Sequence, residues 1–106
     1  MHDSYTLEDT SAMIDKQAIK KQWKREPLYC IKRAHEELDE MEKAIKNGLS
    51  PEEVSIEGVD VMYFLFQAIS NSAPKIPLSV AFYKKYESNW LNLKKTEDEN
   101  GKMVRR

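Results

Sequence analysis

The residues that are scarce in this sequence already narrow its class. Its 106 residues include one cysteine, three glycines and four prolines, and no apolar run approaches the length of a membrane-spanning helix. The single cysteine, Cys30, cannot form a disulfide within the chain, so we expect a reducing compartment. The opening residues MHDSYTLEDT are too polar and acidic for a signal peptide. The sequence therefore predicts a cytoplasmic protein without a membrane partner.

A surplus of charge of one sign is also missing, because 18 acids balance 17 bases and leave a net charge of −1. This excludes the overall basic surface that duplex nucleic acid binding needs. The charges are nevertheless unevenly spread: residues 27–70 carry nine acids and four bases, and residues 71–106 carry four acids and eight bases. The unevenness indicates either ordinary solvated faces or an acidic centre for a cation beside a basic end for phosphates.

Apolar residues recur every three or four positions in four segments, which is the spacing of amphipathic helices. The first helix is expected to have Thr10 or Ser11 as its N-cap, and the third to begin at Ser50, which forms a capping box with Glu53. The expected helices are 8–24, 27–47, 51–70 and a fourth from about residue 79 to 93, followed by a polar tail or arm at 96–106 with a turn at 100–101. These elements predict a single all-α domain over residues 1–106, a bundle of four helices.

Two acids in the third predicted helix need an explanation beyond surface solvation. Glu57 and Asp60 are three residues apart and share a helix face that continues through Val61, Phe64 and Ala68. Such a face borders the interior, where a carboxylate must be paired, protonated or bound to a metal. This helix is apolar on nearly all sides, so we expect it to be buried nearly all round.

The second predicted helix offers acids at the same spacing, Glu37 and Glu40, on a stripe with small apolar residues. Because the link around residues 48–50 is short, the two helices should lie antiparallel, and the four carboxylates can converge on one point. No Lys or Arg occurs in residues 47–74 to neutralise them, so a bound cation is the better compensation. Carboxylates alone suit Mg²⁺, with Mn²⁺ as the alternative, rather than zinc.

Together, EELDEMEKAI and EGVDVMYFLF resemble the MazG-type nucleoside triphosphate pyrophosphohydrolases, whose motif is EExxE followed by ExxD. That all-α superfamily also includes the dimeric dUTPases and phosphoribosyl-ATP pyrophosphohydrolase, and the resemblance extends over about residues 23–89. The residues that match the family's magnesium ligands are Glu37, Glu40, Glu57 and Asp60. The resemblance makes Glu36, Glu37 and Glu40 the catalytic candidates, with Glu36 as a helper base or an outer contact of the site. Asp39 and Glu42 are expected to face solvent.

The C-terminal segment YKKYESNWLNLKK also resembles a pattern found in MazG-like proteins, a Lys followed by an Asn and further bases. This implies that Lys85 and Asn89 approach the phosphates or the base, and that Lys94 and Lys95 contact phosphate. The base commonly found three or four residues after the Asn is missing here, so a solvated basic face is the alternative. Five aromatic residues are expected in the core or an interface, with stacking of one on a nucleobase as the alternative: Trp23, Phe82, Tyr83, Tyr86 and Trp90.

The resemblance implies a Mg²⁺-dependent enzyme that hydrolyses ribo- or deoxyribonucleoside triphosphates, (d)NTPs, between the α and β phosphates, giving a monophosphate and pyrophosphate. A homodimer or homotetramer is expected, because three other helices of a small chain cover the apolar third helix poorly. A phosphoribosyl-ATP pyrophosphohydrolase-like activity is one alternative. The other is a non-catalytic helical dimer that binds or regulates and retains the fold.

Overall fold

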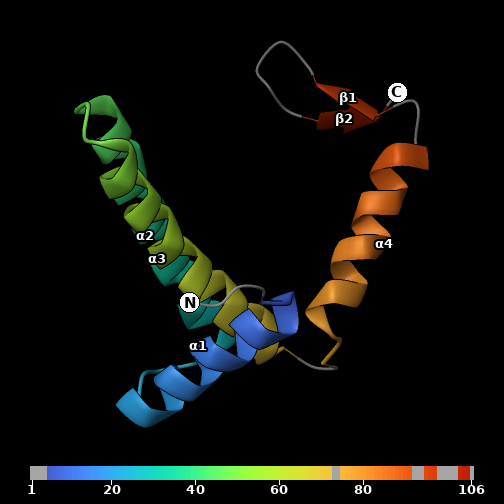
Figure 1. Cartoon of the computed structure of the whole chain (residues 1–106), viewed down its shortest axis with the longest axis horizontal. Coiled ribbons are helices and arrows are strands. Elements are labelled where there is room, and N and C mark those ends of the chain that lie inside the picture. Colours follow the sequence, from blue (N-terminus) through green and yellow to red (C-terminus); the bar gives the residue numbers. More distant parts are fainter. Residues whose placement is uncertain (1–4, 73–74, 92–94, 98–102, 106) are drawn as a thin grey trace. The chain divides into compact units, whose positions relative to one another are not determined.

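The computed structural model describes residues 5–72, 75–91, 95–97 and 103–105 (Figure 1). Its elements are α1 (Leu7–Lys21), α2 (Pro27–Lys46), α3 (Pro51–Ser70), α4 (Leu78–Leu91), β1 (Lys95–Glu97) and β2 (Met103–Arg105). The prediction of four helices and an all-α architecture is confirmed. The chain divides into two compact units, Met1–Lys75 and Ile76–Arg106, so a single four-helix bundle stays a prediction. None of the described helices is both long enough and apolar enough to span a membrane.

The C-terminal segment forms short strands where the sequence predicts only a polar tail or arm. β1 and β2 pair antiparallel, with Thr96 opposite Val104. Each strand has three residues, which is too short for a period-two pattern to be recognised in the sequence. The predicted turn at residues 100–101 lies outside the described residues.

Helix α1 begins and ends earlier than predicted. Its N-cap is Thr6 rather than Thr10 or Ser11, because the Thr6 side chain accepts a hydrogen bond from Asp9 N at 3.0 Å and Asp9 Oδ2 accepts one from Thr6 N at 3.0 Å. At the other end Gln22 adopts a left-handed conformation, with φ 59°, which stops the helix. Trp23 therefore lies in the α1–α2 link and not in the helix.

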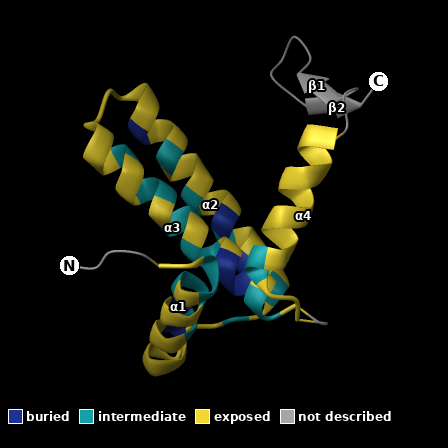
Figure 2. Cartoon of the chain, turned by 45° about the vertical axis from the view of Figure 1, so that its right-hand side comes forward, coloured by how far each residue is buried: buried dark blue, intermediate teal, exposed yellow. Residues whose placement is uncertain are grey.

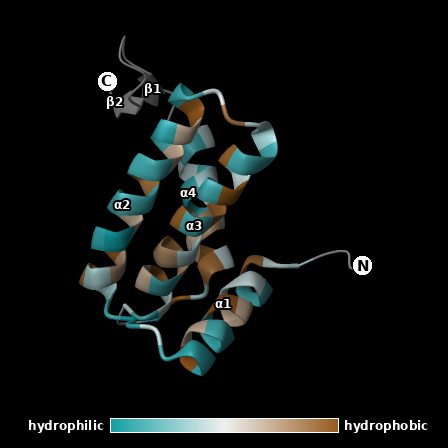
Figure 3. Cartoon of the chain, turned by 90° about the vertical axis from the view of Figure 1, so that its left-hand side faces the viewer, coloured by the Kyte–Doolittle hydropathy of each residue, from teal (hydrophilic) through white to brown (hydrophobic). Residues whose placement is uncertain are grey.

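Helices α2 and α3 form the predicted antiparallel hairpin, and Figures 1 and 3 show them side by side. Pro27 is at the start of α2, and α3 starts with the expected capping box, in which the Ser50 and Glu53 side chains each accept a hydrogen bond from the other residue's backbone N–H. Between the helices Gly48 has φ +70°, a conformation that costs glycine little. Local caps therefore define both ends of the connection.

The α2–α3 seam is built from small residues that allow close packing. On α2 the buried residues are Cys30, Ala34 and Ala44 (Figure 2). On α3 a Cβ added at Gly58 would lie 3.2 Å from the Cε atom of Met41, so glycine allows the close approach. The packing role predicted for Cys30 is confirmed, and burial raises the pKa of its thiol above the ordinary value.

The prediction that α3 is buried nearly all round is wrong for this unit. Its buried residues are Phe66, Gln67 and Ala68 only. Five large apolar side chains remain 39–54% exposed: Ile56, Val59, Met62, Leu65 and Ile69. Helices α1 and α2 therefore leave part of α3 uncovered, and the ribbon of α3 in Figure 3 is coloured as hydrophobic over much of its length. Helix α4 likewise has no buried residue, and its aromatic side chains are exposed.

A polar network ties α1 to the end of α3. Asp15 Oδ2 accepts a hydrogen bond from Ser70 Oγ at 2.8 Å, and its Oδ1 accepts from the Gln67 amide. Arg25 donates from Nε to Gln67 Oε1 at 2.8 Å and from Nη2 to Asp15 at 3.3 Å. Gln67 is only 5% exposed, yet both ends of its amide are satisfied. The network fixes how α1 crosses the open end of the hairpin.

Candidate metal centre

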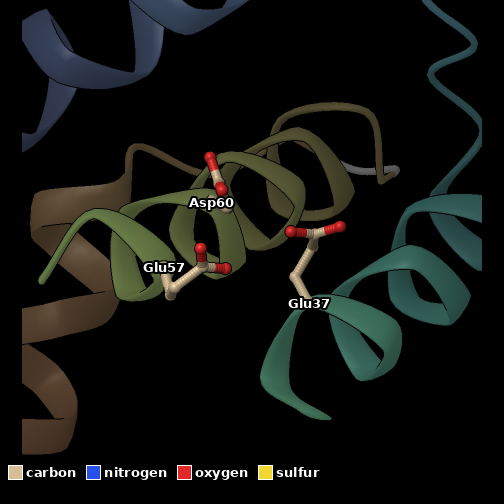
Figure 4. Close-up of side chains that lie close together, drawn as sticks. All are labelled: Glu37, Glu57 and Asp60. Atoms are coloured by element: carbon tan, nitrogen blue, oxygen red, sulfur yellow. The ribbon is translucent and has the colours of Figure 1, made fainter. Parts of the chain in front are cut away.

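Three of the four predicted ligands meet between α2 and α3. Glu37 projects from α2, and Glu57 and Asp60 project from successive turns of α3. One carboxylate oxygen of each residue lies within 4.8 Å of the others, and Figure 4 shows the three side chains converging on the same space. All three residues are half-buried. The predicted convergence of acids from two helices is therefore present for this set.

The three carboxylates are poorly neutralised by the protein. Glu37 accepts a hydrogen bond from Arg33 Nη2 at 3.1 Å. Within the described part of the chain, neither Glu57 nor Asp60 has a hydrogen bond or an ion pair. Like charges this close, with only partial access to water, repel one another unless a cation lies among them.

The donor set fits a hard divalent cation. Carboxylate oxygens are the ligands that Mg²⁺ prefers, at about 2.1 Å, so two ligands on opposite sides of the ion lie about 4.2 Å apart. Since the three oxygens already lie within 4.8 Å of one another, small side-chain adjustments would suffice. Nitrogen and sulfur ligands are absent from this described cluster, which disfavours zinc.

Glu40, the fourth predicted ligand, is not part of the cluster. Its side chain is 55% exposed and forms an ion pair with Lys43 at 3.6 Å. Glu37 is only 18% exposed and faces α3, whereas Glu40, three residues further along α2, lies outside the group of carboxylates that meet. The shared stripe in the sequence was too coarse to separate the two positions.

Glu36 also lies outside the cluster, and it is the second carboxylate held by Arg33. Its Oε1 is 2.9 Å from Arg33 Nε, and its side chain is largely exposed. Asp39 and Glu42 are exposed, as predicted, and Glu42 forms an ion pair with Lys46 at 2.9 Å. The hydrogen bond from Lys46 lowers the pKa of the Glu42 carboxyl.

A cavity of about 630 Å³ lies beside the acids, and Glu37 and Asp60 form part of its wall. Its other lining residues come from α1, the α1–α2 link, α2 and α3. Aromatic side chains dominate the apolar part of this lining: Trp23, Tyr29, Tyr63 and Phe64. The Trp23 and Tyr63 rings meet edge to face at 6.4 Å, and Tyr63 donates a hydrogen bond to Gln17 at 2.7 Å. This volume and lining are typical of a small-molecule site.

Arg33 is the residue of this site that sequence reasoning missed. It lines the cavity, forms ion pairs with Glu36 and Glu37, and lies 4.8 Å from the centre of the Phe64 ring. The hydrogen bond with Tyr29, followed by that with Glu37, raises the pKa of Arg33, so the guanidinium is charged. The signal was the spacing of Arg33 and Glu37, four residues apart on one helix.

The predicted phosphate contacts belong to the other unit. Lys85 and Asn89 are exposed on α4, and Lys95 is in β1. Lys94 lies outside the described residues. The contact of these four residues with phosphates therefore stays a prediction.

Comparisons of this chain with family models, with curated proteins and with solved structures found no match.

Proposed function

We propose that the chain is a Mg²⁺-dependent nucleotide pyrophosphohydrolase of the MazG-like type. It would hydrolyse (d)NTPs between the α and β phosphates, release a monophosphate and pyrophosphate, and so remove unwanted nucleotides in the cytoplasm. The observation that carries the proposal is the adjacency of three carboxylates and an aromatic-lined cavity. A nucleoside triphosphate has a matching pair of parts, a metal-binding polyphosphate and a flat base.

Glu37, Glu57 and Asp60 are the residues that would hold the ion. A Mg²⁺ bound there would neutralise phosphate charge and acidify a water molecule. The resemblance makes Glu36 and Glu40, which lie outside the cluster, the candidates for accepting the proton of the attacking water. The water oxygen forms a bond to phosphorus as the bridging P–O bond breaks, and pyrophosphate leaves.

The aromatic part of the cavity would hold the nucleobase. Trp23 is 46% exposed despite its size, so its ring is not committed to the core. Its ring meets the Tyr63 ring edge to face, and the indole offers a flat apolar surface of the kind on which bases stack. This favours Trp23, among the aromatics singled out in the sequence, as the stacking residue.

The test is release of pyrophosphate from a panel of (d)NTPs and phosphoribosyl-ATP in the presence of Mg²⁺. We expect cleavage of at least one nucleotide by the wild type and none by Asp60→Asn, with Glu42→Gln as a matched control that retains activity. Cleavage of phosphoribosyl-ATP alone would establish the alternative substrate. Equal activity of Asp60→Asn and wild type would refute the site.

One observation favours the second candidate, a non-catalytic helical module that binds nucleotides. Arg33 pairs with Glu37, so the protein itself supplies a positive charge to the cluster, as a site that binds no cation would need. In that case the panel would show nucleotide binding by calorimetry without pyrophosphate release.

The proposal includes self-association into a homodimer or homotetramer. A small groove of about 170 Å³ on the hairpin is lined by apolar residues and one histidine: Ile31, Ala34, His35, Leu38, Val61 and Leu65. Together with the exposed side chains of α3 it leaves apolar surface that a second copy would cover. Light scattering on the purified chain measures this directly, and a monomer at all concentrations would exclude it.

A further inference from the structure

The position of Arg33 suggests more than a structural ion pair. Arg33 lines the cavity together with Glu37 and Asp60, and its guanidinium contacts Glu36 at 2.9 Å, Glu37 at 3.1 Å and the face of Phe64 at 4.8 Å. One third of its side-chain surface is exposed, so the side chain is accessible from solvent. Arg33 is thus the only cationic side chain described in contact with the cluster Glu37, Glu57 and Asp60.

The hydrogen bonding of Arg33 is incomplete. The Nε atom is buried and close to Glu36, but it has no hydrogen-bond partner of acceptable geometry within the described structure. A guanidinium has five N–H donors in a planar fork, which suits two oxygens of one carboxylate or phosphate. A buried donor without a hydrogen-bond partner lowers the stability of the protein. The guanidinium of Arg33 can therefore gain a hydrogen bond from an acceptor on a ligand.

Arg33 and a divalent cation would compete for the same carboxylate. Glu37 is the one member of the cluster that already has a positive partner, and it is also a predicted ligand. A cation bound to Glu37 weakens the attraction between that carboxylate and the guanidinium. The released guanidinium would face a cavity in which a phosphate offers a stronger bidentate partner.

We infer that Arg33 exchanges partners: it neutralises Glu37 in the metal-free protein and contacts a phosphate group of the ligand when a divalent cation occupies the carboxylates. This inference rests on the proposed function, because it needs both the cation and an anionic ligand. It makes Arg33 a substrate-binding residue and makes the binding of cation and phosphate mutually favourable. By thermodynamic linkage each ligand then raises the affinity for the other by the same factor.

The test is calorimetric titration of the full chain, first with MgCl₂ and then with imidodiphosphate at saturating Mg²⁺. Imidodiphosphate is a non-hydrolysable probe that carries two phosphoryl groups and no base, so the result does not depend on base preference. The variants are Arg33→Gln, which removes the charge, and Arg33→Lys, which keeps the charge but loses the fork. Lys46→Gln is the matched control, because it removes the base of another ion pair on α2 with the same four-residue spacing.

For Arg33→Gln we expect opposite changes in the two titrations. Mg²⁺ alone should bind about fivefold more tightly, since a competing ion pair of about 1 kcal/mol is removed. Imidodiphosphate should bind at least about tenfold more weakly, because a bidentate contact is lost. Arg33→Lys should leave the Mg²⁺ affinity near wild type and weaken the probe, and Lys46→Gln should change neither.

A purely structural role predicts a different pattern. If Arg33 only holds Glu37 in place, Arg33→Gln leaves the Mg²⁺ affinity unchanged or lowers it, and the inference is wrong even though the metal site stands. If the wild type binds no Mg²⁺, the proposed function and the inference fail together. Helical content by circular dichroism confirms that each variant is folded, and Arg33→Lys alone decides the phosphate contact if Arg33→Gln does not fold.

Discussion

Helix α2 carries glutamates in two different environments, one half-buried and one exposed. On one face Glu37 is 18% exposed, lies beside Glu57 and Asp60, and borders a cavity. Glu40 and Glu42, by contrast, are more than half exposed, and each pairs with a nearby lysine of the same helix. The comparison teaches that an acid-rich motif carries no single meaning, because burial and cross-helix neighbours decide what each carboxylate can do.

The largest expected effect comes from removing the charge of one half-buried carboxylate of the cluster. Glu57→Gln should abolish the rise in melting temperature that Mg²⁺ produces and lower pyrophosphate release by at least about 100-fold, since metal-assisted charge stabilisation contributes several kcal/mol. The helical content should remain intact. The measurement is a thermal melt with and without Mg²⁺, together with the activity assay.

An exposed glutamate of α2 provides the control for that experiment. Glu42→Gln should retain both the Mg²⁺ response and the activity, because Glu42 is exposed, pairs with Lys46 and lies outside the cluster. If Glu57→Gln and Glu42→Gln both abolish the Mg²⁺ response, the distinction between half-buried and exposed carboxylates is wrong.

A second, intermediate effect concerns the polar network at the open end of the hairpin. Gln67→Leu keeps the side-chain volume but leaves Asp15 and Arg25 without their amide partner, which should lower the free energy of unfolding by about 2 kcal/mol. Urea denaturation measures this. Ser55→Ala, at an exposed position of the same helix, should change the stability little, and equal effects would show that the network is dispensable.

The smallest effect is expected at the exposed start of α3. Hydrogen bonds from the Ser50 backbone and side chain lower the pKa of the Glu53 carboxyl below its ordinary value of 4.5. A lowered folded-state pKa means that the charged carboxylate stabilises the protein above the ordinary pKa and loses this contribution as the pH falls through the folded value. Glu53→Gln should therefore be less stable than wild type at neutral pH.

Denaturation midpoints measured between neutral pH and pH 3 check the Glu53 prediction. The difference between wild type and Glu53→Gln should shrink once the pH falls below 4.5. A difference that stays constant over this range would mean that the charge of Glu53 is irrelevant to the cap.

Much of the α2–α3 hairpin could be predicted from the sequence. The helix starts are predicted by Pro27, Ser50 and Pro51, and the turn is predicted by Asn47-Gly48. Caps and turns can be predicted because they depend on residues within three or four positions. The start of α1 was predicted wrongly: Thr6 forms a capping box with Asp9, whereas Met13 and Ile14, three residues after Thr10 and Ser11, cannot accept the return hydrogen bond. The acid three residues after Thr6 is the sequence signal that identifies this N-cap.

The candidate site was only partly predictable. The meeting of Glu37 with Glu57 and Asp60 followed from the short hairpin, but the exclusion of Glu40 did not. Residues 47–74 contain no base, as the sequence shows, but Arg33, one turn before Glu37 on α2, supplies one to the cluster from the other helix. The cavity depends on the α1–α2 link, whose path has no periodic signal in the sequence.

The sequence by itself determined the helices of the hairpin, their antiparallel pairing and the shared face of Glu57 and Asp60. These features follow from hydrogen bonds and side-chain spacings within one or two helical turns. Only the tertiary structure decided that Glu37 and not Glu40 joins the cluster, that Arg33 pairs with it, and that a cavity lies alongside. These depend on how each helix is rotated about its own axis, which is set by the close packing of small residues such as Ala34 and Gly58 across the seam.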